Sequence, residues 1–366
     1  TRTAGQVIVE HGFGAAYDAA LLEEPQRELY EKFVRDSGLH GLPFYVVPVP
    51  YPPPFTLAFV PSTLLPPIPG FISWTLFHVV VLTLYELRLA KYFAVTRPGM
   101  LIAAVVLSAP AFIHLIMGQL SVWLVVFFGE SLIAFEKHMP VRSGIWLALL
   151  VCKPQVLVLI LPALLLARQW RILLGMIVAT VALIAPTFLL SPGWFADFLG
   201  GIFDAAGSSG TVMNIFPSSM TNWRAFALNA SHYLPPKIVW PAAVAAMLAT
   251  AIAGLSCSFR LRSRALGRQR LAWLGLAAST CALSWHAHVH QSLLLVPPVF
   301  AVIGVWPGLK DPAVFACMGT SAVFLVASTT LGIGEAHDIL GLAMLAGLIV
   351  LTAICALSLQ ADPAPG

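Results

Sequence analysis

Long apolar runs, each near the length of a membrane span, recur along almost the whole chain and constrain its fold more than any other feature. A transmembrane helix needs roughly 20 mostly apolar residues. Charged residues make up only 10% of the 366 residues, whereas a soluble domain has about 25%. We therefore predict an all-α, polytopic membrane helix bundle with about nine to eleven spans, half-spans included. The expected spans lie near 71–92, 99–117, 119–135, 143–167, 172–190, 238–257, 271–285, 291–306, 312–331 and 338–358.

Basic residues gather in the short segments between the runs, above all in 260–270, in 168–171 and around Arg88, Lys91 and Arg97. Cytoplasmic loops of membrane proteins are rich in Lys and Arg, so we expect these segments on the cytoplasmic side. The net charge of +4 is small, and we expect no nucleic-acid partner. The five cysteines lie mostly inside apolar runs without metal-type spacing, and we interpret them as small buried side chains.

The chain divides into three parts by composition. Residues 1–50 are the most polar long stretch, and we expect them to form an extracytoplasmic first-loop region. It contains a short helix with Pro25 in its first turn and a stop at Gly38. Residues 51–360 form the bundle, with a short helix near 53–65 and an outer loop, 191–237, whose pieces can lie along the membrane surface. Residues 361–366 are a polar tail.

Lys153 interrupts the apolar run 143–167, and Pro154 follows it directly. Arg142 precedes the run and Arg168 follows it, and the charge rule places both on the cytoplasmic side. Two full crossings need about 40 residues, so we expect two half-helices that meet at Lys153 and face protein or a water-filled cavity. In the alternative, 143–167 is one tilted span and the basic segment 260–270 lies outside.

A lysine at bilayer depth costs about 3 kcal/mol or more, so it needs a role. Three roles are open for Lys153. Its stem can extend along apolar surface until the ammonium reaches the interface. It can pair with a carboxylate, which Glu130 of the neighbouring span could supply. It can also bind the phosphate of a lipid ligand, because a compact ammonium suits an oxyanion.

His286, His288 and His290 lie within five residues at the boundary of a span. On a helix the first and last would share a face, whereas in an extended segment all three would align. A metal site lacks a partner Cys or Asp at a recognisable spacing. We interpret the histidines as contacts to an anion or substrate, since histidine titrates near neutrality. Two alternatives stay open: interfacial residues without a specific role, and a metal site.

Other polar residues lie at the ends of apolar runs. Gln119 follows Gly118 in a turn between two spans, either as a turn residue or as a substrate contact. The long loop carries polar side chains among aromatic ones, which suits recognition of a sugar or headgroup and equally suits an interfacial loop anchored by tryptophans. The residues concerned are Asn214, Ser218, Asn222 and Arg224, with Trp194 and Trp223 as anchors.

Six stretches occur in a characteristic order: HGFGAAYDAALL, VPVPYPPPFTLAFVPSTLLP, the Gly118-Gln119 turn, LALLVCKPQVLVLILPALLLARQWR, NIFPSSMTNWRAF and LSWHAHVHQSLLLVPP. Together they resemble glycosyltransferase family 87, a GT-C class of membrane enzymes typified by α-1,2-mannosyltransferases. Each motif alone is degenerate, and their order and spacing carry the resemblance. It covers nearly the entire chain.

The resemblance implies a GT-C type bundle that transfers a sugar, mannose or another hexose or pentose, from a polyprenyl-phosphate donor to a hydroxyl of a glycolipid or glycan acceptor, with inversion. It implies an active site on the extracytoplasmic face of a bacterial plasma membrane, with no cofactor and no metal. The expected partners are membrane lipids, the polyprenyl-phosphate-linked sugar and the acceptor.

The resemblance also assigns residues. Lys153 falls on the family's Lys-Pro pair, and His286 and His288 fall on its Ser-Pro-His-type segment, so these residues with His290 are expected to bind the donor phosphate. His290 and Gln291 stand where many members have Tyr-Asp. The expected substrate-binding residues are Tyr51, Gln119, Asn222, Arg224, Gln291 and Asp18.

The general base implied by the resemblance is an Asp a few residues before the pair that corresponds to Ala4-Gly5. We therefore expect that Asp, and a first span, to precede Thr1, and we expect the sequence to be truncated there. Asp18 follows the family pattern but is not that base. Two other interpretations stay open: a lipid or solute transporter that uses the broken helix at Lys153, and a non-catalytic fragment of the same fold.

Overall fold

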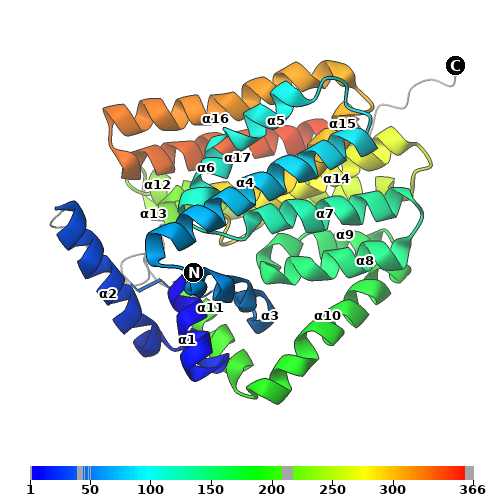
Figure 1. Ribbon diagram of the computed structural model, residues 1–366. Helices are drawn as coiled ribbons and strands as arrows, with labels where there is room; N and C mark the ends of the chain where they lie inside the picture. The colour runs from blue at the N-terminus through cyan, green and yellow to red at the C-terminus, as the bar shows by residue number, and fades with distance from the viewer. Residues whose placement is uncertain are drawn as a thin grey trace, which may run out of the picture. The chain divides into compact units, whose positions relative to one another are not determined.

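The computed structural model describes residues 2–38, 44, 46–47, 49, 51–207 and 217–358, and the regular elements among them are all helical (Figure 1). The all-α prediction is therefore confirmed. The α-helices are α1 Arg2–His11, α2 Ala19–Ser37, α3 Pro53–Thr56, α4 Pro67–Tyr92, α5 Gly99–Val106, α6 Ala109–Ile116, α7 Ser121–Glu136, α8 Pro140–Ala148, α9 Ile160–Leu166, α10 Trp170–Leu190, α11 Trp194–Gly207, α12 Trp223–Ala230, α13 Pro236–Ser256, α14 Leu266–Leu283, α15 Val296–Ile303, α16 Lys310–Thr330 and α17 Ile333–Ser358.

Five helical segments within the described residues are long and apolar enough to cross a membrane: Pro67–Tyr92, Trp170–Leu190, Pro236–Arg262, Pro307–Thr330 and Ile333–Ser358. A sixth results if the bent pair α5 and α6 counts as one span. The chain is thus a multi-pass membrane protein. The segments Pro140–Cys152, Pro154–Leu166 and Val289–Ile303 are apolar but shorter.

The expected span 99–117 is not one continuous helix, because the helix breaks at Leu107 and Ser108 and its halves differ in direction by 48°. Ser108 has an extended backbone, and its hydroxyl accepts a hydrogen bond from the Ala111 amide at 3.4 Å. Pro110 occupies the first turn of α6, where its missing N–H costs no helical hydrogen bond. Ser108 and Pro110 thus start a new helix inside the apolar run.

The run 143–167 is interrupted at Lys153, which has φ −135° and ψ 78° between two short 3₁₀ turns, Leu149–Cys152 and Pro154–Leu157. A residue before proline is pushed out of the helical region, so Pro154 accounts for the break. The start of α8 lies against the start of α10: a Cβ on Gly144 would stand 2.0 Å from the Ile172 carbonyl oxygen. Arg262 donates hydrogen bonds to the carbonyls of Leu166 and Ala167. Both ends of the interrupted segment therefore lie near one another.

The chain folds as two compact units, residues 1–76 with 180–217 and residues 77–179 with 218–366. In the first unit α1 packs on the 3₁₀ turn Leu57–Leu64. The ring of Tyr17 contacts those of Trp194 and Phe198, which both belong to α11 and also contact each other. Helix α2 begins at Ala19, six residues before Pro25, because the Asp18 carboxylate accepts the Ala20 amide at 2.8 Å. The expectation of Pro25 in the first turn is therefore wrong, and Gly38 ends the helix with φ 69° as expected.

The second unit is built around α14, in which every residue from Ala272 to Ala282 is buried. A helix that is buried all round must be enclosed by other helices, and α14 packs against α13, α15 and α17. Helices α16 and α17 lie side by side (Figure 1). Near the start of α14, the Arg270 guanidinium binds both carboxylate oxygens of Glu136 at 2.8 and 2.9 Å and donates to the Ala301 carbonyl at 2.8 Å. This contact joins the ends of α7, α14 and α15.

Candidate functional site

Lys153 is only 3% exposed and lies at the centre of a polar cluster in the second unit. Its Nζ is 3.1 Å from Gln119 Oε1, 3.4 Å from Ser121 Oγ and 3.1 Å from His290 Nε2. His290 is 2% exposed and Ser121 is fully buried. The structure thus brings together three of the residues singled out in the sequence, Lys153, Gln119 and His290.

Each member of the cluster is placed by a local break in regular structure. Lys153 lies at the interruption described above. Gln119 lies between α6 and α7 in a turn in which Gly118 has φ 61° and the Gln119 amide binds the His114 carbonyl at 3.1 Å. His290 belongs to a 3₁₀ turn, Val289–Leu295, that leads into α15. The breaks release these side chains from helical spacing, so residues 34 and 137 positions away can meet Lys153.

The three histidines form a row, as expected for an extended segment. The His286 and His288 ring centroids are 5.3 Å apart, and the His288 and His290 rings stack at 5.7 Å with an angle of 8°. The segment is held by the long loop. The Thr221 amide donates to the Ala287 carbonyl at 2.7 Å, and the Asn222 amide group donates to the Ser284 carbonyl at 2.8 Å.

Burial and nearby positive charge keep this row uncharged. Burial, followed by the charges of Arg224 and Lys153, lowers the pKa of His286 to about 4. Burial, followed by interactions with His286 and Lys153, lowers the pKa of His288 to about 3. Both imidazoles are therefore neutral near pH 7, and each can donate one hydrogen bond and accept one.

Asn222 and Arg224 come from the start of α12. The Asn222 side chain caps this helix by accepting from the Ala225 amide at 2.9 Å, and it is the same side chain that holds Ser284. The Arg224 guanidinium lies 5.0 Å from the centre of the Trp285 ring. Both residues thus adjoin the histidine segment, Asn222 as its anchor.

Glu130 does not pair with Lys153. Its carboxylate binds Arg88, with Nε–Oε1 at 2.6 Å and Nη2–Oε2 at 3.0 Å, and accepts from the Tyr85 hydroxyl at 3.2 Å. Ser121 and Glu130 are nine residues apart on α7, so roughly 13 Å of helix separates Glu130 from the Lys153 contact. The suggested Lys153–Glu130 pair is therefore wrong.

The remaining predicted residues have different surroundings. Gln291 follows His290 and is 2% exposed, with its Oε1 buried and without a hydrogen-bond partner. Tyr51 and Asp18 belong to the first unit, where the Tyr51 carbonyl accepts from the Tyr17 hydroxyl at 2.6 Å and Asp18 caps α2. Asn214 lies outside the described residues.

Sequence reasoning missed Ser121 and two histidines. His114 is 1% exposed, and neither of its ring nitrogens has a hydrogen-bond partner. Its ring centroid is 5.2 Å from that of His78 on α4. The signal was present, because an ionisable residue inside a membrane span marks a functional site by default. Ser121 carried no such signal, since a serine at the start of a helix is ordinary.

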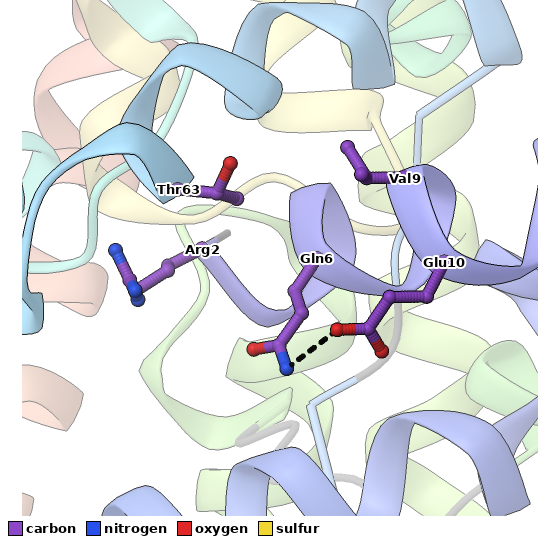
Figure 2. A pocket seen from close by; sticks show the side chains of 5 residues that line it. All are labelled: Arg2, Gln6, Val9, Glu10 and Thr63. Atoms are coloured by element: carbon purple, nitrogen blue, oxygen red, sulfur yellow. Dashed lines mark hydrogen bonds between the residues drawn. The ribbon is translucent and has the colours of Figure 1, made fainter.

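A pocket of about 290 Å³ lies in the first unit, lined by Arg2, Gln6, Val9, Glu10 and Thr63. Figure 2 shows Gln6 and Glu10 on one helix, joined by a hydrogen bond of 3.1 Å. None of these five residues was predicted to have a functional role. The pocket is polar, and its Arg2 side chain is bound to the backbone carbonyls of Ser62 and Leu65.

The described residues contain no group of three His, Cys, Asp or Glu side chains arranged to hold a metal ion. The Lys153 cluster instead combines one cationic side chain with amide, hydroxyl and imidazole groups. Donors of this kind, fixed in a water-poor site, stabilise an oxyanion that forms during a reaction.

Comparison with known proteins supports one family. The sequence pattern of glycosyltransferase family 87 matches residues 50–297, which is more than half of the chain and includes the whole Lys153 cluster. No characterised protein and no solved structure gives a significant match.

Proposed function

The chain belongs to glycosyltransferase family 87, and on that premise we propose that it transfers a sugar from a polyprenyl-phosphate donor to a hydroxyl of a lipid or glycan acceptor. The observation that carries the proposal is the buried contact of Lys153 with Gln119, Ser121 and His290. A membrane-embedded cluster with a positive charge suits a lipid-linked phosphate better than a soluble substrate.

The proposed reaction is an inverting displacement. The acceptor oxygen bonds to the anomeric carbon as the bond from that carbon to the phosphate oxygen breaks. The electron pair of the broken bond leaves with the polyprenyl phosphate, and the acceptor proton passes to the carboxylate that the family resemblance implies. The residues of the Lys153 cluster stabilise the charge on the departing phosphate, and Gln119, Asn222, Arg224 and Gln291 contact the substrates.

We place this site on the extracytoplasmic face of the membrane. The two ends of the interrupted segment 140–166 lie near one another, and Arg262 of the basic segment 260–270 binds carbonyls at its C-terminal end. A segment that enters and leaves on the cytoplasmic side has its turning point, Lys153, towards the opposite face. In this proposal the shorter apolar helices are half-spans, which raises the number of membrane segments above the six long ones.

A transporter is the second candidate, and one observation favours it. Carriers of the inverted-repeat type use two broken helices at the substrate site, and this chain has a second break at Leu107–Ser108. The second broken pair leads through α6 to His114 and Gln119, next to Lys153. Movement of a polyprenyl-phosphate sugar without transfer would identify this alternative.

The test is transfer of radiolabelled sugar by membranes that contain the full-length gene product, supplied with polyprenyl-phosphate sugars in turn. We expect Lys153→Met to reduce transfer about 10²-fold or more. Lys137→Met is the matched control, because Lys137 is exposed at the other end of α7 and lies over the Tyr92 ring. Equal transfer by the Lys153→Met and wild-type proteins would remove Lys153 from the site. Lack of transfer from every donor, with labelled donor crossing vesicles, would establish the transporter.

A further inference from the structure

The geometry around Lys153 determines which side of the His290 ring is available to a ligand. An ammonium group has three hydrogens and no lone pair, so it can only donate hydrogen bonds. Three polar atoms lie within 3.4 Å of Nζ: Gln119 Oε1, Ser121 Oγ and His290 Nε2. In its protonated form Lys153 can therefore direct one hydrogen to each of these atoms.

The contact with His290 fixes a tautomer. A neutral imidazole carries its proton on one ring nitrogen and accepts on the other. If Nε2 accepts from Lys153, the proton lies on Nδ1. The structure leaves Nδ1 of His290 buried and without a hydrogen-bond partner. A buried donor without a partner destabilises the folded protein, and a ligand that accepts its hydrogen bond would remove this cost.

We propose that Lys153 is a positioning residue that holds His290 as the Nδ1–H tautomer, and that His290 Nδ1–H donates the hydrogen bond to the phosphate of the donor lipid. This inference rests on the proposed function for the identity of the ligand. The imidazole keeps its proton throughout, and only a hydrogen bond strengthens as the phosphate gains charge. The ammonium behind the ring polarises the N–H and makes it a stronger donor.

Other polar groups of this part of the molecule also lack hydrogen-bond partners. Gln291 Oε1 and both ring nitrogens of His114 are also buried without partners. His288 stacks on the face of the His290 ring, so it restrains the ring plane without occupying either nitrogen. A phosphate with attached sugar hydroxyls offers the acceptors and donors that such a mixed set of groups needs.

The first measurement is the tautomer itself. The full-length protein, labelled with ¹⁵N in its histidine rings and reconstituted in phosphatidylcholine bilayers, is analysed by solid-state NMR, with His290 assigned by its loss in His290→Asn. We expect Nδ1 to be protonated and Nε2 to be unprotonated in the wild type. Lys153→Met should convert His290 to the other tautomer or to a mixture, whereas Ser121→Ala should leave it unchanged, because the Lys153–His290 contact remains.

The second measurement adds undecaprenyl phosphate to the same bilayers. We expect the His290 Nδ1 resonance to shift in the wild type and not in Lys153→Met. In transfer assays, Lys153→Met and His290→Asn should each lower kcat/KM by about 10²–10³-fold, and the double variant should lose no more than either, because the two residues act as a unit.

The outcomes separate this inference from the proposed function. A protonated Nε2 in the wild type, or an unchanged tautomer in Lys153→Met, overturns the inference even if sugar transfer is normal. If His290 has the expected tautomer and the protein transfers sugar, but the Nδ1 resonance does not shift when undecaprenyl phosphate is added, the assignment of His290 to the phosphate is overturned. A correct tautomer with neither transfer nor a phosphate response overturns the assignment and the proposed function together.

Discussion

His286 and His288 make the folded protein sensitive to acid at the scale of single residues. Their folded-state pKa values, about 4 and about 3, lie below the value near 6.5 expected for an unfolded chain. At pH values between the folded-state and unfolded-state pKa values, the histidines bind protons in the unfolded chain but not in the folded chain. The free energy of unfolding therefore falls as the pH falls below 6.5, by up to about 1.4 kcal/mol per pH unit for each histidine, and is unaffected by these groups above it.

The check is the Tm of the detergent-solubilised protein measured between about pH 6.5 and pH 4. The Tm should decline over this range, and less steeply in His288→Gln than in the wild type. His232→Gln is the control, because His232 is exposed and lies outside the row. A slope that is the same in all three proteins would show that the row does not titrate on unfolding.

Single residues also show how far the candidate site could be predicted. Lys153, Gln119 and His290 were found because each is a polar residue that interrupts or borders an apolar run. The pairing of Glu130 was predicted wrongly, since a sequence gives the neighbouring span but not the height of a carboxylate along it. Its true partner, Arg88, lies 42 residues earlier on α4.

At the scale of elements, the close packing of α8 on α10 depends on a residue without a side chain. A Cβ on Gly144 would lie 2.0 Å from the Ile172 carbonyl oxygen and 2.7 Å from the Met176 nitrogen. Both are backbone atoms and cannot move independently of α10. We expect Gly144→Ala to push the two helices apart and to lower the free energy of unfolding by about 1–3 kcal/mol.

Gly319→Ala on α16 is the matched control, because nothing lies within 4 Å of its added Cβ. Alanine favours a helix over glycine by about 0.5–1 kcal/mol, so this variant should be as stable as the wild type or more stable. Denaturation midpoints of both variants in the same detergent give the comparison. A Gly144→Ala protein as stable as Gly319→Ala would show that α8 and α10 are not in backbone contact.

The helices differ from the prediction where an apolar run does not form one continuous helix. The run 99–117 is apolar throughout, and apolar length alone predicted one span. The Ser108-Ala109-Pro110 sequence nevertheless carries a helix start, with a capping side chain and a proline in the first turn. The break at Lys153 was predicted because charge and proline coincide there. At Ser108 a proline likewise marks a helix start, but no charged residue accompanies it.

At the scale of the whole molecule, the position of the basic segments predicts which parts face the cytoplasm. We expect Arg142 and Arg168 on the cytoplasmic side and the exposed Tyr233 on the other. Cysteines introduced at these three positions can be labelled with a membrane-impermeant maleimide in a Cys317→Ala background, since the other four native cysteines are buried. In intact cells only Tyr233→Cys should react. Labelling that places positions 142 and 168 on opposite sides of the membrane would support the alternative in which 143–167 is one tilted span.

The fold class was predictable from the sequence, but the grouping of the segments into compact units was not. Composition and apolar length predicted an all-helical membrane protein, and the helices near 67–92, 170–190, 236–256, 310–330 and 333–358 follow the predicted runs. The two compact units were not predicted. The first combines residues 1–76 with 180–217, and such a union depends on contacts between distant segments that hydropathy does not encode.

The Arg270–Glu136 pair has a consequence for the synthesis of the protein. Glu136 leaves the ribosome 134 residues before its partner. At a translation rate of about 5–20 residues per second, Arg270 is synthesised roughly 7–27 s after Glu136. During this time the Glu136 carboxylate lacks its partner. Helix α7, which ends with Glu136, and α14, which carries Arg270, are not among the helices long and apolar enough to cross a membrane in the described chain. We therefore expect α7 to stay beside the insertion machinery until α14 is synthesised.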